Sequence, residues 1–395
     1  MSSTLTKPRI QSIDLLRGLV MIIMALDHVR DYFHEGAYIY DPLDLDKTTT
    51  ALFFTRWITH FCAPVFMFLA GTSAFIIGQK KTKKELSVFL MKRGLWLILL
   101  EFTVFNFAWN FDITFTNIYF IVIWALGVSM FVLGLLIFLP PKVILLFSIL
   151  LIAGHNLLDG IIVNGNTLPA FGWALLHQQN FFSWMGKNVL VGYPLIPWIG
   201  VMSLGYCFGS LYAPTVEAAK RKKVLLFLGG GAVVLFVLLR LMNIYGDPFP
   251  WTSQSTALKT VLSFIKVNKY PPSLLYLLIT LGPSLIFLAF TEQASSKISK
   301  IVSVYGRVPM FYYILHIYLL HLVTMVAAGL FTNFSWRVWI LKEPLWLTQS
   351  LKGYGFSLSI VYLVWLSIVI LLYPLCKWYD SYKQNHKEKW WLSYL

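Results

Sequence analysis

The feature of this sequence that most restricts its fold is a series of apolar stretches, each long enough to cross a lipid bilayer. A spanning helix needs about 20 apolar residues, because each residue advances the helix by about 1.5 Å. In lipid every backbone polar group must be satisfied internally, so each stretch is predicted to be a helix. Ten stretches occur, at about 11–33, 50–79, 93–109, 117–139, 141–158, 190–213, 223–244, 270–291, 308–330 and 354–376. The sequence therefore predicts an all-α polytopic membrane protein, a bundle of ten or eleven transmembrane helices.

Composition supports this class. The 395 residues are 58% hydrophobic and 12% charged, whereas soluble domains have about 25% charged residues. The net charge of +15 comes from lysines clustered between apolar stretches, which favours a lipid bilayer as partner and argues against nucleic acid. The three cysteines lie inside apolar stretches without ligand spacing, so they are interpreted as core residues. No metal site is predicted.

The distribution of basic residues predicts the orientation. Twenty of the 32 Lys and Arg residues fall on the side of the amino terminus and ten on the other side. By the positive-inside rule both termini are expected in the cytoplasm, with the protein in a plasma membrane such as the bacterial inner membrane. The expected parts are an amino-terminal tail (1–10), a transmembrane domain (11–376) and a carboxy-terminal tail (377–395).

The first apolar stretch carries ionisable side chains on one helical face. Asp14, Arg17, His28 and Asp31 recur at helical spacing, with methionines between them. Arg17 and His28 are about 16 Å apart along a helix. Ionisable groups at membrane depth normally face a bundle interior or a wet cavity, so a narrow passage is expected beside this helix. The alternative is an ion pair at the helix end, with Asp27 and His28 at the water boundary.

Three arginines at the cytoplasmic ends of helices each stand beside a glycine: Arg17–Gly18, Arg93–Gly94 and Gly306–Arg307. Arginine binds phosphate through a planar fork, and glycine lets a ligand approach the backbone. Arg17, Arg93, Arg307 and Gly18 are therefore candidates for binding a multiply phosphorylated anion. Ordinary positive-inside anchoring is the alternative. Glu101 lies within an apolar stretch and needs a partner, for which Arg17 or Arg93 is expected.

Polar residues also collect toward the opposite, outer ends of the stretches. His28, His34 and His60 are candidate bases there, because a neutral imidazole can take a proton near pH 7. Asp27 or Asp31 is expected to orient that imidazole. The other members of this predicted polar basin, taken as substrate-binding, are Asp31, Trp198, Asp247, Lys269 and Tyr270.

Two blocks, RIQSIDLLRGLVMIIMALDH and RWITHFCAPVFMFLAGTSAF, resemble the transmembrane acyltransferases related to heparan-alpha-glucosaminide N-acetyltransferase, in their bacterial branch. Weaker likeness extends over roughly residues 9–320. The resemblance implies an enzyme that takes acetyl from cytoplasmic acetyl-CoA, as co-substrate, and delivers it to an amine or hydroxyl of a sugar or glycan across the membrane. The same resemblance is compatible with a homodimer.

In this family a histidine near the outer end of the first helix, assisted by an asparagine, carries the acetyl group or acts as base. His28 occupies the family's asparagine position in this sequence. His34, in the following loop, is then the best match for the histidine, and His60 stands where relatives can carry an aspartate. The resemblance therefore leaves the base open among these three residues. It also leaves open whether transfer is direct or passes through an acyl-enzyme.

Two other functions compete with the acyltransferase. A proton-coupled transporter of a small anionic or sugar-like solute would use the same Asp and His residues as a proton relay and the arginines as an anion site. The absence of an apparent inverted repeat counts against it. A sensor is the third class, and the sequence contains no large domain outside the apolar stretches to do the sensing.

Overall fold

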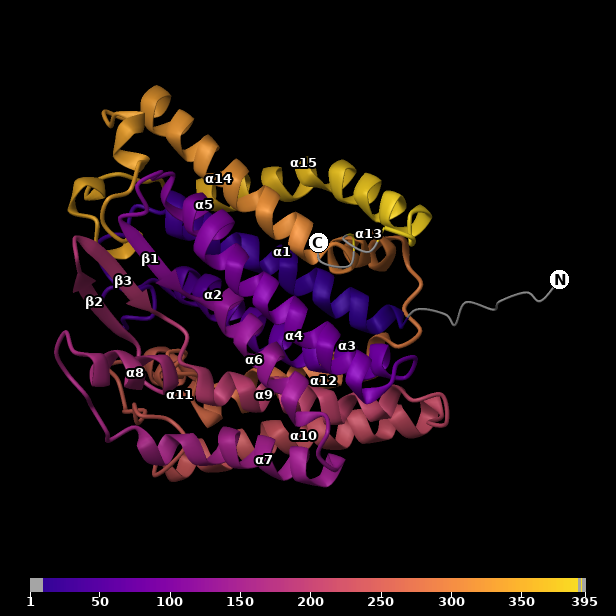
Figure 1. Ribbon diagram of the computed structural model, residues 1–395. Coiled ribbons are helices and arrows are strands. Elements are labelled where there is room, and N and C mark those ends of the chain that lie inside the picture. Colours follow the sequence, from indigo (N-terminus) through magenta and orange to yellow (C-terminus); the bar gives the residue numbers. More distant parts are fainter. Residues whose placement is uncertain (1–9, 390–391, 393–395) are drawn as a thin grey trace.

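A computed structural model describes residues 10–389 and Leu392 (Figure 1). The predicted amino-terminal tail, which includes Lys7 and Arg9, lies outside the described residues apart from residue 10. The last helix, α15 (Leu358–Asn385), continues beyond residue 376, so the segment predicted as a carboxy-terminal tail begins as helix.

Helix α1 (Gln11–Phe33) runs through the middle of the bundle and is buried along most of its length. It packs mainly against α3 (Cys62–Gly78), α12 (Leu274–Thr291), α13 (Lys297–Arg307), α14 (Pro309–Phe331) and α15. Burial on all sides explains how α1 can carry charged residues, since its side chains face protein instead of lipid.

The remaining helices form pairs around this centre. Helix α4 packs on α6, α7 on α9, α9 on α3, and α10 on α12. Their bounds are α2 (Thr50–Ile58), α4 (Lys83–Leu100), α5 (Asn106–Asn110), α6 (Val122–Leu136), α7 (Pro141–Gly154), α8 (Leu168–Leu176), α9 (Leu195–Phe208), α10 (Ala218–Met242) and α11 (Ala257–Ile265). A π-helical segment, Glu101–Phe105, joins α4 to α5, and a 3-10 turn, Thr59–Phe61, joins α2 to α3.

Glycines bring several of these pairs close together. A Cβ added to Gly18 would overlap the carbonyl of Val302 in α13, and one added to Gly306 would overlap the carbonyl of Asp14. Gly71 in α3 and Gly205 in α9 meet the opposite helix in the same reciprocal way. Small residues are enriched at membrane helix contacts because they let the backbones approach. These glycines therefore allow the paired helices to pack closely.

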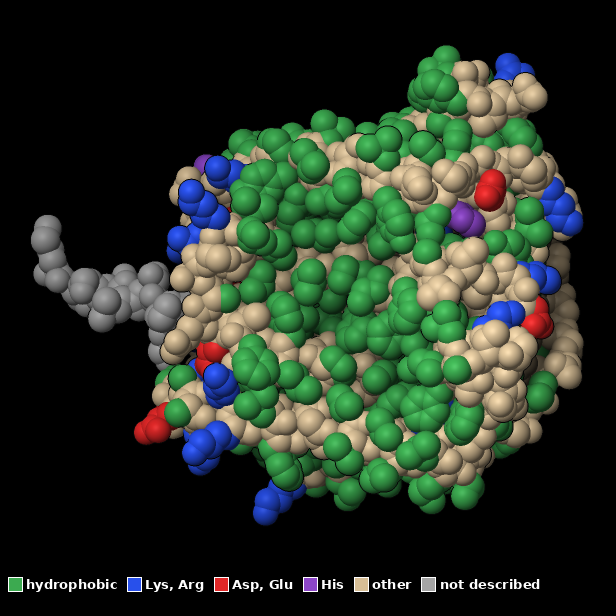
Figure 2. Space-filling model, turned by 180° about the vertical axis from the view of Figure 1, so that it is seen from behind, with side chains coloured by type: hydrophobic (Ala, Val, Ile, Leu, Met, Phe, Trp, Pro, Cys, Tyr) green, Lys and Arg blue, Asp and Glu red, His purple; other side chains and the backbone are tan. Residues whose placement is uncertain are grey.

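In the described part of the chain, seven helical stretches are long and apolar enough to span a membrane: Thr50–Gly78, Pro141–Leu158, Leu195–Tyr212, Ala218–Met242, Leu274–Thr291, Pro309–Phe331 and Leu358–Asn385. Helices α1 and α4 also occupy predicted spans but carry more charge, and α6 has only 15 residues. Figure 2 shows hydrophobic side chains covering the middle of one face, with Lys and Arg gathered toward its two sides. Such a band is typical of a protein embedded in a bilayer. The count of ten spans stays a prediction.

The two ends of the bundle differ. At the end where α1 begins, which we name the basic end, α1, α4, α13 and α15 carry Arg17, Arg93, Arg307 and Lys383. The opposite end, the loop end, holds a small sheet of β1 (Asn117–Phe120), β3 (Lys187–Val191) and β2 (Asn180–Trp184). Strand β3 lies between the others, parallel to β1 and antiparallel to β2. Figure 1 shows the sheet on the left and α13 on the right.

Candidate active site

Two cavities lie along α1 and adjoin at His28. The basic-end cavity, of about 420 Å³, is lined by Arg17, Arg93, Arg307 and Lys383. The loop-end cavity, of about 530 Å³, lies among the segments that follow α1 and the sheet. Six residues line both cavities: Asp27, His28, Val122, Tyr193, Lys269 and Tyr313. The space expected beside this helix is therefore present, with cations at one end and an imidazole where the cavities meet.

The walls of the basic-end cavity carry more positive than negative charge. Arg17 donates to Ser73 Oγ at 2.9 Å and lies 3.5 Å from Asp14, and Arg307 lies 2.7 Å from Asp380. Neither of these carboxylates lines the cavity. Its walls carry five cationic side chains, with Lys269 added where the cavities meet, and one carboxylate, that of Asp27. The middle of the cavity is apolar and flexible, with five methionines in its wall: Met21, Met24, Met67, Met130 and Met310. A polyanionic group at the mouth with a thin arm pointing inward suits this shape.

The glycine beside Arg17 does not have the role expected for it. The backbone of Gly18 faces the carbonyl of Val302, so the close approach there is made by α13 and not by a ligand. Gly94 likewise meets the carbonyl of Gly127 in α6. Of these predicted arginine–glycine pairs, only the arginines line the cavity.

His28 forms a hydrogen-bonded pair with His316 of α14. His28 Nδ1 lies 2.8 Å from His316 Nε2, and His316 Nδ1 lies 3.0 Å from the carbonyl oxygen of Tyr312. A carbonyl oxygen can only accept a hydrogen bond, so His316 Nδ1 must carry a proton. In the neutral ring His316 Nε2 is then unprotonated and accepts a hydrogen bond from the N–H at His28 Nδ1. His28 Nε2 is then left with a lone pair. This arrangement fixes the tautomer and the ring orientation that a general base needs.

The carboxylate of Asp27 pairs with cationic side chains and does not orient the histidine pair. Its carboxylate lies 2.9 Å from Arg30 and 2.6 Å from Arg56, and Lys269 Nζ is 3.9 Å away. Asp31 pairs with Arg30 at 2.7 Å. The expectation that Asp27 or Asp31 orients the imidazole is therefore wrong, and His316 holds that position. The charged cluster instead places three cations beside two carboxylates where the cavities meet.

The other two candidate bases lie away from both cavities. His34 is buried, its Nδ1 accepts a hydrogen bond from the Gly36 amide at 3.0 Å, and burial lowers its pKa. His60 is also buried, beside Tyr276, and neither of its ring nitrogens has a hydrogen-bond partner. Neither residue lines either cavity. Of the three candidates, His28 alone has access to the space where a substrate would lie.

Three of the residues predicted to bind substrate line the loop-end cavity, namely Asp31, Lys269 and Tyr270. Trp198 does not; it is fully buried and stacks on Tyr193, which does. Asp247 is also buried behind the wall, where its carboxylate accepts from the Asn268 amide at 2.8 Å and from Ser273 at 2.7 Å, and burial raises its pKa. Its contacts fix the loop that carries Lys269, so Asp247 acts at a distance from any ligand.

The arginines expected to pair with Glu101 are not its partners. Glu101 Oε2 accepts from the backbone amide of Trp124 at 2.9 Å, in the first turn of α6. The first amide groups of a helix lack partners within the helix, so the carboxyl group satisfies them. Glu101 is a helix cap in the bundle interior.

Sequence reasoning missed several residues of the site. His316 and Tyr313 lie on α14, and Lys383 lies in the segment predicted as a tail. The sequence does show His316 as a polar residue in an apolar stretch. Which distant helix it faces is set by tertiary packing.

The family model described as "Heparan-alpha-glucosaminide N-acetyltransferase, catalytic" matches residues 9–239, more than half of the chain. The chain belongs to this family. No curated protein matches the sequence.

The match to the heparan-alpha-glucosaminide N-acetyltransferase family covers α1 through most of α10, including Arg17, Arg93, Asp27 and His28. Membership suggests a membrane acetyltransferase. Arg307 and His316 lie outside the matched residues. The part of the site that comes from α13 and α14 is therefore known from the structure of this chain.

Proposed function

We propose that this protein moves an acetyl group from acetyl-CoA, bound at the basic end, to an amine or hydroxyl of a sugar or glycan in the loop-end cavity. The observation that carries the proposal is the junction of the two cavities at His28. In this proposal the basic end faces the cytoplasm, where acetyl-CoA is supplied, as the distribution of Lys and Arg predicts, and both termini are cytoplasmic. The membrane is the plasma membrane, the inner membrane in a bacterium.

The four basic-end cations bind the phosphates of CoA, and the methionine-lined section holds the pantetheine arm. Arg17 and His28 are eleven residues apart, about 16 Å along α1, so an arm extended along the helix brings the thioester toward His28. The acceptor enters from the loop end. It approaches the thioester from the other side of the junction.

The chemical step follows from the tautomer of His28. The nitrogen or oxygen of the acceptor attacks the thioester carbonyl while His28 Nε2 takes the proton from that atom. No positive charge therefore builds up on the acceptor as the new bond forms. The carbon–sulfur bond then breaks, and the proton goes from His28 to the leaving thiolate. His316 holds the ring and, through the Tyr312 carbonyl, stabilises the transient imidazolium. Lys269 lies close enough to the junction to stabilise the negative charge of the intermediate. This is direct transfer, without an acyl-enzyme.

The test is an acetyl-transfer assay with the full chain in lipid nanodiscs, using radiolabelled acetyl-CoA and amino sugars as acceptors. His28→Ala is expected to lower turnover by about 10²- to 10⁴-fold, the usual contribution of a general base, while acetyl-CoA still binds. His34→Ala is the matched control, because that histidine lies outside both cavities, and it should keep most of the activity. Full activity in His28→Ala contradicts the proposal. Solute uptake into liposomes without acetyl transfer would favour the transporter instead.

A further inference from the structure

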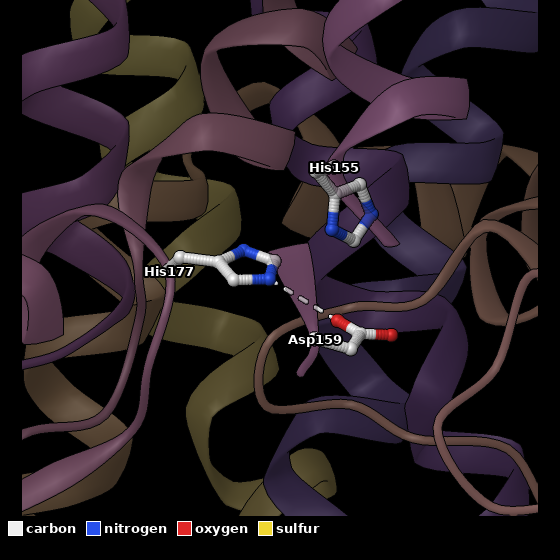
Figure 3. A group of neighbouring side chains, drawn as sticks. All are labelled: His155, Asp159 and His177. Carbon is white, nitrogen blue, oxygen red and sulfur yellow. Dashed lines mark hydrogen bonds and ion pairs between the residues drawn. The ribbon is translucent and has the colours of Figure 1, made fainter. Parts of the chain in front are cut away.

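A second group of chemically capable side chains lies at the loop end, apart from both cavities. His155 follows α7, Asp159 lies one turn later, and His177 follows α8 (Figure 3). One ligand atom from each residue lies within 4.8 Å of the others. His177 Nε2 and Asp159 Oδ1 are 3.1 Å apart, and Figure 3 shows the His155 ring beside this pair.

The two imidazoles of this group are buried without enough partners. His155 is 2% exposed and His177 is 3% exposed. Within the described residues, neither ring nitrogen of His155 makes a hydrogen bond of normal geometry, and Nδ1 of His177 makes none. An unsatisfied buried polar group destabilises the fold, so two such rings side by side need a compensating interaction. The described contacts of the fold do not supply it.

We propose that His155, Asp159 and His177 bind one divalent transition-metal ion of the zinc class. Two imidazoles and one carboxylate are the ligands that such ions prefer, whereas Mg²⁺ and Ca²⁺ favour oxygen alone. Zinc lies about 2.0–2.2 Å from its nitrogen and oxygen ligands, so the separation of His177 Nε2 and Asp159 Oδ1 already suits a shared ion. Rotation of the His155 ring would bring one of its nitrogens to the same ion as the third ligand. A water molecule completes a tetrahedral site.

Neighbouring groups can orient these ligands. Asn156 donates to Asp159 Oδ2 at 2.8 Å, which leaves Oδ1 facing His177. The carbonyl of Pro272 lies beside the His155 ring, where it can accept the proton of the nitrogen that does not bind metal. Outer partners of this kind are usual around metal-binding histidines and carboxylates.

The position of the site indicates a structural role. None of the three residues lines either cavity, but Gln179 and Phe181, which follow His177 closely, line the loop-end cavity. A metal held between the end of α7 and the start of β2 would fix this part of the cavity wall. Zinc bound here therefore supports the acceptor side of the molecule without entering the chemistry.

Binding of Zn²⁺ alone to the full chain, stripped of metal with chelator, is the direct test. Equilibrium dialysis with elemental analysis should give one Zn²⁺ per chain, not displaced by millimolar Mg²⁺ or Ca²⁺. His155→Ala and His177→Ala should each weaken binding at least tenfold, whereas His386→Ala, in the last described segment, should not. Co²⁺ in place of Zn²⁺ should give the visible absorption of a tetrahedral site.

A thermal melt adds a readout that does not depend on activity. Zn²⁺ should raise the melting temperature of the wild type and leave that of His155→Ala unchanged, because a ligand that binds only the folded state stabilises it. His177→Gln, which keeps the polarity and approximate size of the side chain, is the second variant if His155→Ala fails to fold. Wild-type protein that binds no Zn²⁺, or binds it equally in the His155 and His177 variants, overturns the proposal.

Discussion

The basic-end and loop-end cavities are built in opposite ways, although they adjoin at one side chain. At the basic end, cations project from four separate helices around a flexible methionine wall. Where the cavities meet, charges are locked together, with Asp27 between Arg30 and Arg56 and with His28 held by His316. A polyanion needs a surplus of positive charge, whereas proton transfer needs a fixed neutral imidazole. In the proposed function, this difference separates binding from chemistry along one helix.

This separation predicts that the two ends fail differently when mutated. In the double variant Arg17→Ala/Arg93→Ala, the dissociation constant of acetyl-CoA should rise at least about 100-fold, since each charge-assisted hydrogen bond contributes about 1.5–3 kcal/mol. Turnover at saturating acetyl-CoA should stay within a few-fold of wild type. A titration in nanodiscs beside the transfer assay measures both. Arg337→Ala, on an exposed loop-end segment, is the control. A large loss of turnover with unchanged affinity would break the comparison.

Substitution at His316 should show the reverse pattern. His316→Ala removes the acceptor for His28 Nδ1, so we expect turnover to fall about tenfold or more while acetyl-CoA affinity is unchanged. His316→Gln restores an acceptor and should recover part of the rate. The pH profile of turnover should also shift in His316→Ala, because the partner of the base is gone. A purely structural role for His316 would lower the amount of folded protein without moving that profile.

The glycine contact between α1 and α13 tests whether the basic end depends on helix spacing. Gly306→Leu should force the helices apart and lower stability by about 1–3 kcal/mol, the usual cost of overpacking. Because Arg307 is the next residue, acetyl-CoA affinity should fall with it. Gly231→Leu, where a Cβ meets nothing within 4 Å, is the control. Thermal melting in detergent and the same titration are the measurements, and equal melting temperatures in the two variants would refute the packing argument.

The smallest effect is expected in the loops of the loop end. Burial would raise the pKa of Asp112, but its hydrogen bonds from Lys342, Thr114 and Thr116 outweigh burial and lower it. A carboxyl group whose pKa is lowered on folding stabilises the folded state at pH values above its pKa in the unfolded chain, which is about 4. This contribution is lost as the pH falls from there toward the lower pKa of the folded state. Asp112→Asn should therefore melt below wild type at pH 7, and the gap should shrink below pH 4. A gap that stays constant to pH 3 would show that charge is not its source.

Much of the fold could be predicted from sequence, because hydropathy reports helices directly. All ten predicted stretches overlap helices, and the charged face of α1 was visible from the spacing of Arg17 and His28. The site was harder. Resemblance to the family favours His34 over His28 as the base. The structure buries His34 outside both cavities, and the burial of a loop residue cannot be read from its sequence. The His28–His316 contact joins residues 288 apart, and such a pairing depends on how α14 packs against α1.

That separation along the chain has a consequence for biogenesis. His28 emerges from the ribosome early, whereas His316 and Arg307 follow only after most of the helices have been made. His28 therefore lacks its partner, and the basic end lacks one of its arginines, until α13 and α14 have entered the membrane. If the proposed function is right, a chain stalled during insertion would therefore hold neither the complete set of basic-end cations nor the paired histidines.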